Sequence, residues 1–167
     1  GMNVRVYNTS WSAAHATYIA DLERAFTDPA ISAGGLTIKR CPKDDELFSE
    51  SDFIAVHMSL TRDNQHFINR RRLMQCRRGV MIVNVSRGAL IDQRAVADAL
   101  RSGLMGGYAA DVLDPEPVQQ DNPLIGLPNV HITPHIGSRT YESVVRQGSA
   151  AVENLIHVLS LNASNQA

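Results

Sequence analysis

The stretch Val80-Met81-Ile82-Val83-Asn84-Val85-Ser86-Arg87-Gly88 decides the fold class of this 167-residue chain. Its first four residues are continuously apolar rather than alternating, which is typical of a strand covered on both faces of a sheet. Polar residues and a glycine follow, as they do where a strand ends in a turn. The run Phe53-Ile54-Ala55-Val56 has the same character. Both runs therefore predict parallel strands covered on each side by helices.

Outward from this stretch, apolar β-rich runs alternate with helical patterns. Strands are expected near residues 3–8, 36–40, 53–57, 80–85, 107–112 and 130–132, and helices near residues 12–26, 43–49, 69–76, 92–102 and 139–160. The alternation predicts an α/β fold with a doubly wound, mostly parallel sheet. We expect one domain over residues 1–161, followed by a flexible tail over residues 162–167, which are polar and small.

Composition narrows the possible partners. The 16 basic and 17 acidic side chains leave a net charge of -1, so neither a nucleic acid nor an anionic membrane is an expected partner. The basic run at residues 69–72 opens a helical pattern and is expected to form a solvated helix face. Cys41 and Cys76 lie far apart, which favours reduced thiols, and the histidines show no metal-ligand spacing. No leader or membrane-spanning stretch is expected, and the chain is predicted to be cytoplasmic.

Polar side chains follow several of the predicted strands. Ligands of open α/β sheets bind beyond the carboxyl ends of the strands. His57, residues 84–87, Asp111 and His135 all occupy such positions. The sequence therefore predicts that these residues contribute to one site.

Three of the side chains in this half of the chain suit a small acid as ligand. Arg87 carries a permanent charge and a planar fork that can bind a carboxylate. His135 can transfer a proton near neutral pH, and Glu116 beside it would favour the charged imidazole. Taken singly, each has a plainer alternative: a surface arginine, a histidine at a turn, a loop carboxylate. Their combination predicts a site for a 2-keto or 2-hydroxy acid.

Several segments of the chain carry a resemblance to a known family. Asn84–Gly88, Asp111–Pro117 and Thr133–Ser138, together with Ser51–Thr61 and Gly103–Asp111, occur in family order. They resemble the signatures of the D-isomer-specific 2-hydroxyacid dehydrogenases, from about residue 2 to about residue 159. The resemblance implies a Rossmann-like fold that is truncated at its N-terminus. It also implies an oxidoreductase that interconverts small 2-keto acids and D-2-hydroxy acids.

The same resemblance implies roles for individual residues. Arg87, Glu116 and His135 would be catalytic, and the cofactor would be NAD or NADP. Residues implied at the cofactor are Asn8, His57, Ser59, Asn84, Val85, Ser86, Asp111, Gly137 and Ser138. Asn8 stands where NAD-specific relatives usually carry an acid that binds the ribose, so the choice between NAD and NADP stays open.

Two parts of the family pattern have no counterpart in these residues. Family members place a substrate domain and a first βα unit with a Gly-x-Gly-x-x-Gly turn before the segment that residues 1–8 resemble, and that turn occurs nowhere in the sequence. We therefore expect the isolated chain to bind dinucleotide poorly and to be inactive or weakly active. The alternative is a non-catalytic dimerisation or nucleotide-sensing module, as in family corepressors.

Three structural expectations complete the sequence analysis. Arg87, Glu116 and His135 should converge in one cleft. The strand Val4–Tyr7 should pair with Phe53–Val56, so that no strand edge is left open, and the alternative is a strand from a second chain. The last helix carries an apolar stripe that should mediate homo-oligomer formation or pack back on the sheet.

Overall fold

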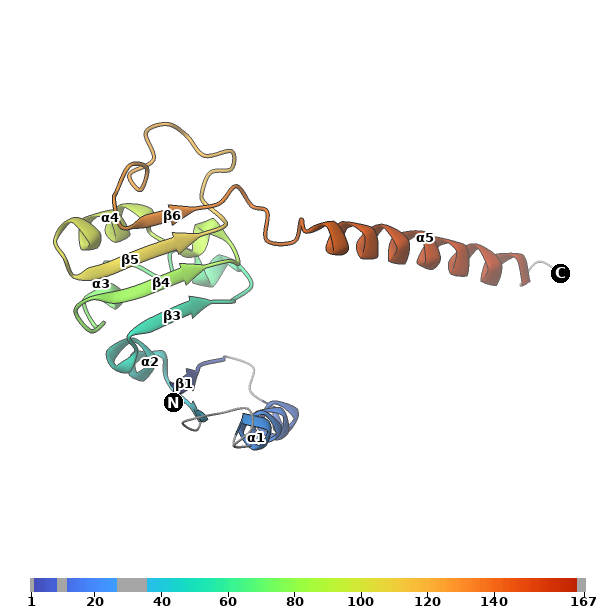
Figure 1. Cartoon of the computed structure of the whole chain (residues 1–167), viewed down its shortest axis with the longest axis horizontal. Coiled ribbons are helices and arrows are strands. Elements are labelled where there is room, and N and C mark those ends of the chain that lie inside the picture. Colours follow the sequence, from blue (N-terminus) through green and yellow to red (C-terminus); the bar gives the residue numbers. More distant parts are fainter. Residues whose placement is uncertain (1, 9–11, 27–35, 165–167) are drawn as a thin grey trace.

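The computed structural model describes residues 2–8, 12–26 and 36–164, and Figure 1 shows their arrangement. The strands are β1 (Met2–Val6), β2 (Leu36–Arg40), β3 (Phe53–Val56), β4 (Val80–Asn84), β5 (Met105–Ala110) and β6 (Val130–Ile132). The helices are α1 (Ala13–Phe26), α2 (Asp44–Glu50), α3 (Arg70–Leu73), α4 (Gln93–Arg101) and α5 (Tyr141–Ser164). The predicted order of elements is confirmed. Because α5 continues through Ser164, residues 162–164 belong to this helix and not to the predicted tail.

The described strands form two parallel sheets in place of the expected single one. One sheet has four strands in the order β3-β4-β5-β6, and the other contains β1 and β2. The expected pairing of β1 with β3 is wrong: β1 pairs with β2 from Met2 opposite Leu36 to Val6 opposite Arg40, and β3 pairs with β4. Pairing with β2 leaves the other edge of β1, and the edge of β3 that faces away from β4, without a strand partner among the described residues, so a strand from a second chain stays a prediction. The α/β class with parallel strands is confirmed.

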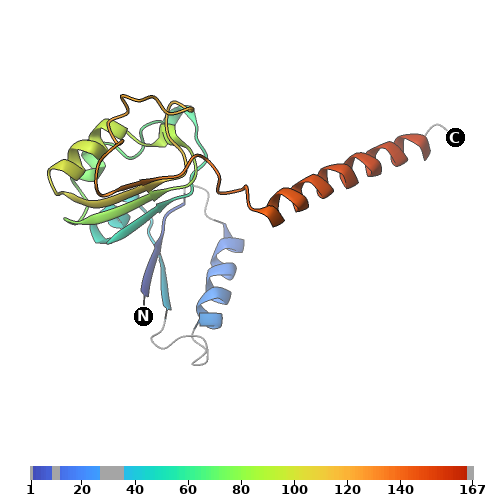
Figure 2. The same cartoon turned by 45° about the horizontal axis from the view of Figure 1, so that its top comes forward.

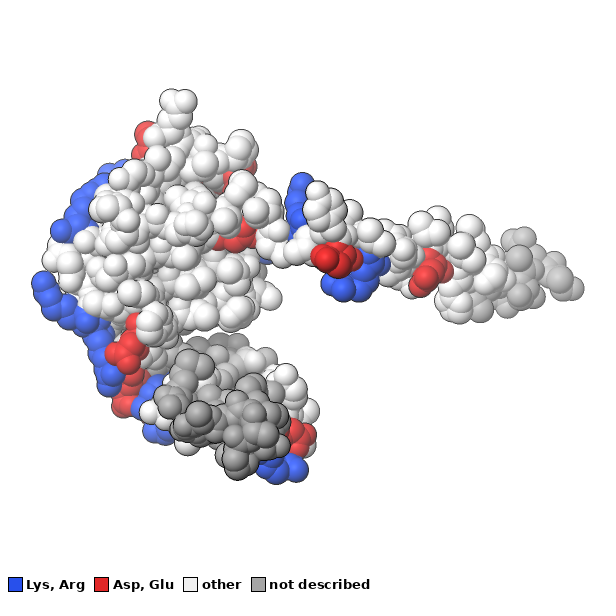
Figure 3. Space-filling model, viewed as in Figure 1, with Lys and Arg blue, Asp and Glu red and all other residues white. Residues whose placement is uncertain are grey.

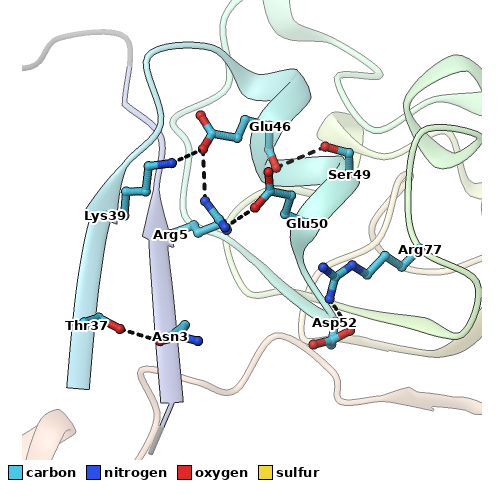
Figure 4. A network of polar contacts seen from close by, with 9 residues as sticks. All are labelled: Asn3, Arg5, Thr37, Lys39, Glu46, Ser49, Glu50, Asp52 and Arg77. Carbon is cyan, nitrogen blue, oxygen red and sulfur yellow. Dashed lines mark hydrogen bonds and ion pairs between the residues drawn. The ribbon is translucent and has the colours of Figure 1, made fainter. Parts of the chain in front are cut away.

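Side chains of α2 hold the two-stranded sheet beside the larger body, as Figure 4 shows. Arg5 of β1 donates to Glu46, at 3.0 Å between Nη1 and Oε1, and also pairs with Glu50. Lys39 of β2 pairs with Glu46 at 2.6 Å. These bonds raise the pKa of Lys39 and lower that of Glu46, in each case mainly through the hydrogen bond between the two side chains. They place β1 against α2 and not along the free edge of β3.

The hydrophobic core lies between the four-stranded sheet and its helices. Ile82 of β4, Val96 of α4 and Leu124 are fully buried. Helix α4 starts at Asp92, whose carboxylate accepts the Ala95 amide at 3.0 Å, and its alanine-rich sequence favours the helix. The helix thereby buries a full apolar face against β5.

The other face of this sheet is open, which corrects the expectation of strands covered on both sides. Side chains along β4 alternate between buried and exposed, with Met81 44% and Val83 38% exposed, and Phe53 of β3 is 72% exposed. In Figure 1, α3 and α4 lie behind the strands and the open face is turned to the viewer. Figure 3 shows that this face is largely uncharged.

Helix α5 extends away from the body (Figures 1 and 2). Its apolar stripe, which includes Val145, Val152, Leu155, Ile156 and Leu159, is more than half exposed at each of these residues. The expectation that it packs back on the sheet is therefore wrong for the described residues, while self-association stays a prediction. Among the helices that the structure describes, none is both long and apolar enough to cross a membrane.

The basic residues 70–72, which were expected to form a solvated helix face, are only partly exposed to solvent. Asn69 caps α3 by accepting the Arg72 amide at 3.2 Å, and Arg70 and Arg71 are exposed as predicted. Arg72 is not solvated: its guanidinium lies 3.8 Å from the Phe67 ring centre and pairs with Asp44 at 2.5 Å. Its charge is neutralised within the fold, so it contributes to packing and not to a nucleic-acid surface.

Candidate active site

Three strand ends meet along one edge of the four-stranded sheet. Asn84 of β4 is aligned with Ala110 of β5, and Ala110 with Ile132 of β6. Because the strands are parallel, the segments that follow them emerge side by side. They are residues 85–88, 111–117 and 133–138, the same segments that carry the predicted catalytic side chains.

Glu116 and His135 form a direct pair at this edge. Nδ1 of His135 lies 2.8 Å from Oε2 of Glu116, and Oε1 of Glu116 accepts the Leu113 amide at 3.1 Å. Each carboxylate oxygen thus has its own partner, which orients Glu116 toward the imidazole. The hydrogen bond from His135 is the main cause that lowers the pKa of Glu116. Both side chains are about half exposed, at 51% and 41%, so solvent can reach the pair.

Asp111 organises the loop that carries His135. Its Oδ1 accepts the Thr133 hydroxyl at 2.5 Å and the Ile136 amide at 2.9 Å, and its Oδ2 accepts the Gly137 amide at 2.8 Å. These bonds, the one from Thr133 first, lower the pKa of Asp111. His135 itself has a φ of 53°, a conformation that L residues seldom adopt. The bonds on both sides of His135 hold the loop in this conformation.

Arg87 lies on the neighbouring loop with an exposed side chain. Its Nη1 donates to the Ser86 carbonyl at 2.6 Å, and no carboxylate among the described residues forms an ion pair with it. A Cβ on the next residue, Gly88, would lie 2.0 Å from the Leu113 carbonyl oxygen. The two backbones are therefore in contact a few residues before Glu116. The contact of Glu116 with His135 is thus observed, and the convergence of Arg87 on the pair stays a prediction.

The residues implied at the cofactor divide into three groups. His57, Ser59, Val85, Gly137 and Ser138 are exposed and Ser86 is half-buried, all near strand ends of the larger sheet. Asn84 is fully buried, and the Asp111 carboxylate is occupied by the His135 loop. Asn8 is exposed after β1, which belongs to the separate two-stranded sheet. Of the residues implied at the cofactor, the structure therefore brings together those that follow β3, β4, β5 and β6, and Asn8 is not among them.

The described residues do not form a complete dinucleotide site. A pyrophosphate needs backbone amides that approach it closely, usually from a glycine-rich turn at a helix N-terminus. Residues 7–12, between β1 and α1, contain no glycine. Strand β1, which precedes these residues, does not pair with β3. The exposed strand ends belong to the four-stranded sheet that includes β3. Among the described residues, the chain supplies the contact between Glu116 and His135 and an exposed arginine, but no cradle for the phosphates.

Two positions are more important in the structure than the sequence indicated. In the sequence, Thr133 was noted only as part of the segment 133–138. In the structure its hydroxyl donates the hydrogen bond that most lowers the pKa of Asp111. Gly88 marked the end of a turn, yet its lack of a side chain is what allows the contact between two loops. Two features of the sequence could have indicated these roles. Thr133 stands two residues before His135, and Gly88 directly follows Arg87.

A comparison with protein families identifies the class of protein. Residues 1–137 match the model of the D-isomer specific 2-hydroxyacid dehydrogenase, NAD binding domain. The chain therefore belongs to this family of NAD-dependent oxidoreductases, and the resemblance noted from the sequence is confirmed.

Individual relatives agree with this assignment. The chain is 40% identical over 116 residues to glyoxylate/hydroxypyruvate reductase B of Pectobacterium carotovorum, covering 70% of this chain and 36% of the relative. It is 38% identical over 112 residues to the glyoxylate reductase of Korarchaeum cryptofilum, covering 67% and 34%. The chain thus spans about a third of the length of the curated relatives it matches.

Solved structures show the same fold. A glyoxylate reductase from Paecilomyes thermophila superimposes with a TM-score of 0.68 and 30% identity, covering 93% of this chain and 48% of that one. The D-lactate dehydrogenase from Aquifex aeolicus, complexed with NAD and lactic acid, superimposes with a TM-score of 0.73 and 26% identity, covering 96% and 47%. The Rossmann-like fold class is therefore confirmed.

Proposed function

We propose that this chain provides the proton-transfer and carboxylate-binding groups of a reductase that acts on small 2-keto acids. The observation that supports this most strongly is the 2.8 Å contact between His135 and Glu116 at the carboxyl edge of the sheet. The relatives include glyoxylate and hydroxypyruvate reductases, which makes a short 2-keto acid the preferred substrate class. Family members reduce such substrates with a nicotinamide cofactor, which supplies the hydride when it is bound.

His135 is the proposed general acid. With Nδ1 engaged by Glu116, Nε2 is the nitrogen that can donate a proton to the substrate's keto oxygen as that oxygen gains charge. Glu116 holds the ring in one orientation, because its other oxygen is tied to the Leu113 amide. In the reverse direction the neutral Nε2 takes the proton from a hydroxyl group.

Arg87 is the proposed anchor for the substrate carboxylate. Its guanidinium is exposed and is not paired with a carboxylate of the described residues. A planar fork can bind both oxygens of a carboxylate, which would orient the adjacent carbonyl toward His135. Arg87→Lys keeps the charge but loses the fork, so it should weaken substrate binding although the charge is unchanged.

Titration with oxalate tests these roles without requiring turnover. Oxalate is planar and carries a carboxylate beside a second carbonyl carbon, as a 2-keto acid does. We expect saturable shifts of the NMR signals of the Arg87 guanidinium and the His135 ring, and we expect the His135 shift to be lost in Arg87→Lys. A titration in which neither signal moves contradicts the proposed site.

Calorimetry tests the cofactor side of the proposal. Since the described residues do not form the phosphate cradle, we expect weak or undetectable binding of NADH and NADPH to the 167-residue chain. Oxidation of either cofactor with glyoxylate, hydroxypyruvate or pyruvate should be slow or absent. Rapid turnover by the purified chain would overturn this expectation.

A second function, a non-catalytic dimerisation module, is favoured by one observation. The apolar stripe of α5 is exposed, with Leu155 59% and Ile156 60% accessible. An exposed stripe of this size is typical of an interface, and a second copy of the chain is the proposed partner. Light scattering should give a homo-oligomer that Ile156→Glu dissociates. A wild-type monomer would exclude this function.

The cytoplasm is the proposed location. Cys41 and Cys76 are both free and buried, and burial raises the pKa of the Cys76 thiol to about 11. Thiols of this kind persist in a reducing compartment. Fractionation of cells that express the tagged chain tests the location.

A further inference from the structure

We infer that Asn84 is a positioning residue that sets the conformation of the Arg87 loop, and not a ligand of the cofactor. This inference rests on the proposed role of Arg87. It departs from the expectation drawn from the sequence, in which Asn84 was one of the cofactor-binding residues. The distinction matters because a positioning residue acts through Arg87, whereas a ligand acts on the cofactor itself.

Asn84 is the last residue of β4 and one of two polar residues among the buried ones described. Its side chain is fully buried, at 0% exposure, on the same face of the strand as Ile82. A side chain with no exposed surface cannot reach a ligand at the edge of the sheet. Its polar atoms must therefore be satisfied within the protein.

Three hydrogen bonds tie the Asn84 side chain to the loop that follows it, and the side chain also interacts with the buried Tyr108 hydroxyl of β5. Nδ2 donates to the Arg87 carbonyl at 2.9 Å, and Oδ1 accepts both the amide and the hydroxyl of Ser86 at 3.1 Å. The side chain thus ties the two residues before Gly88 to the end of the strand. It closes a tight turn whose backbone would otherwise be free to change direction.

The far side of this turn is set by Gly88. Its backbone lies against the Leu113 carbonyl, where a Cβ would come within 2.0 Å. Leu113 in turn donates its amide to Glu116, the partner of His135. Arg87 therefore lies between two restraints, the Asn84 side chain and the Leu113 backbone. Together they fix the position of the Arg87 backbone relative to Glu116 and His135.

A purely structural role for Asn84 would make a different prediction. If the residue served only to fill the core, its loss should resemble that of a buried apolar neighbour on the same face of β4, and Ile82 is the matched control. If it positions Arg87, its loss should loosen residues 85–88 selectively. The core around α4 would then stay ordered.

Three variants of the full chain separate these possibilities by NMR relaxation and amide exchange. Asn84→Ser removes the bond to the Arg87 carbonyl, Ser86→Ala removes only the hydroxyl bond, and Ile82→Val trims the core. In Asn84→Ser we expect the backbone order parameter of Arg87 to fall from about 0.85 to below about 0.6, with Val96 unchanged. Ser86→Ala should show a smaller change in the same loop, and Ile82→Val none there.

Oxalate affinity then connects the loop to the site. We expect about tenfold weaker binding in Asn84→Ser and unchanged binding in Ile82→Val. An Arg87 amide as ordered in Asn84→Ser as in the wild type would overturn the inference, as would equal loosening in Ile82→Val. If wild-type chain does not bind oxalate, the proposed role of Arg87 fails, while the order parameters still decide whether Asn84 positions the loop.

Discussion

The body formed by β3 to β6 with α2, α3 and α4 differs sharply from the two parts attached to it. Every buried hydrophobic side chain among the described residues lies between Cys41 and Leu124. The β1-α1-β2 unit contributes half-buried side chains such as Val4 and Ile38, and α5 contributes exposed ones. The proposed active site lies at the edge of the body, where Glu116 and His135 are about half exposed.

The difference shows what holds each part in place. The body is stabilised by apolar burial, which scales with the area removed from water. The β1-α1-β2 unit is held by backbone pairing and by ion pairs of Arg5 and Lys39 with α2. Helix α5 relies on its own backbone hydrogen bonds. Five experiments test how each of these parts is held in place.

The largest effect is expected at the contact between the two loops of the site. Gly88→Ala should destabilise the body by about 3 kcal/mol or more, because the new Cβ would overlap the Leu113 carbonyl and force the loops apart. Urea unfolding measures the change. Gly107→Ala is the matched control, since its Cβ would meet nothing closer than 3.5 Å, and equal losses in both variants would contradict the explanation.

Core truncation compares the body with α5 directly. Ile82→Ala should lose about 2–5 kcal/mol of unfolding free energy, because Ile82 is fully buried and a cavity would remain. Ile156→Ala, at a residue that is 60% exposed in the single chain, should change the unfolding free energy of the monomer by no more than about 0.5 kcal/mol. A large loss in Ile156→Ala would show that α5 is packed against something in solution.

Removal of Arg5 should release the β1-α1-β2 unit without unfolding the body. Arg5→Ala deletes the bonds to Glu46 and Glu50, and we expect amide exchange in β1 and β2 to become about tenfold faster. The melting of the body should be unchanged. Arg94→Ala, at an exposed arginine of α4, is the control. Slow exchange in Arg5→Ala would mean that these ion pairs do not hold the unit.

Acid should loosen the His135 loop before it unfolds the body. The pKa of Asp111 is lowered in the folded chain, so its bonds stabilise the loop above its ordinary pKa of 3.8 and are lost as the pH falls through the lowered value. NMR signals of the Ile136 and Gly137 amides should report this change below about pH 4. Asp111→Asn should lose the pH dependence, and an identical acid transition in this variant would exclude Asp111 as its cause.

The smallest effect is expected within α5. Gly148 lies in the exposed helix, and a Cβ there would meet nothing within 4 Å. Gly148→Ala should stabilise the helix by up to about 1 kcal/mol through helix propensity alone. Circular dichroism should show higher helicity, with no change in the unfolding of the body. A loss of helicity would place a close neighbour at this position.

Much of the fold followed from local patterns. The strands over residues 36–40 and 130–132 were expected with the limits that the structure has, and the others lie within about two residues of the expected ends. Such patterns report which residues alternate or repeat along one segment. They do not report which strand lies beside which, and the predicted pairing of β1 with β3 failed for this reason.

The sequence predicted which side chains carry the chemistry of the candidate site. It did not predict the contacts that hold those side chains in place. Glu116 and His135 were expected to interact and lie 2.8 Å apart. The roles of Thr133, Gly88 and the Leu113 amide depend on contacts between loops that are distant in sequence. No pattern within one segment carries this information.

The sequence by itself determined the α/β class, the order of elements and the placement of Arg87, Glu116 and His135 after strands. These follow from residue type and spacing, which act locally. Only the tertiary structure decided that the sheet divides into two, that one of its faces stays open and that Asn84 is buried beneath the Arg87 loop. The physical reason is that burial and strand pairing depend on which distant segments compete for the same surface, and that competition is resolved only when the chain folds.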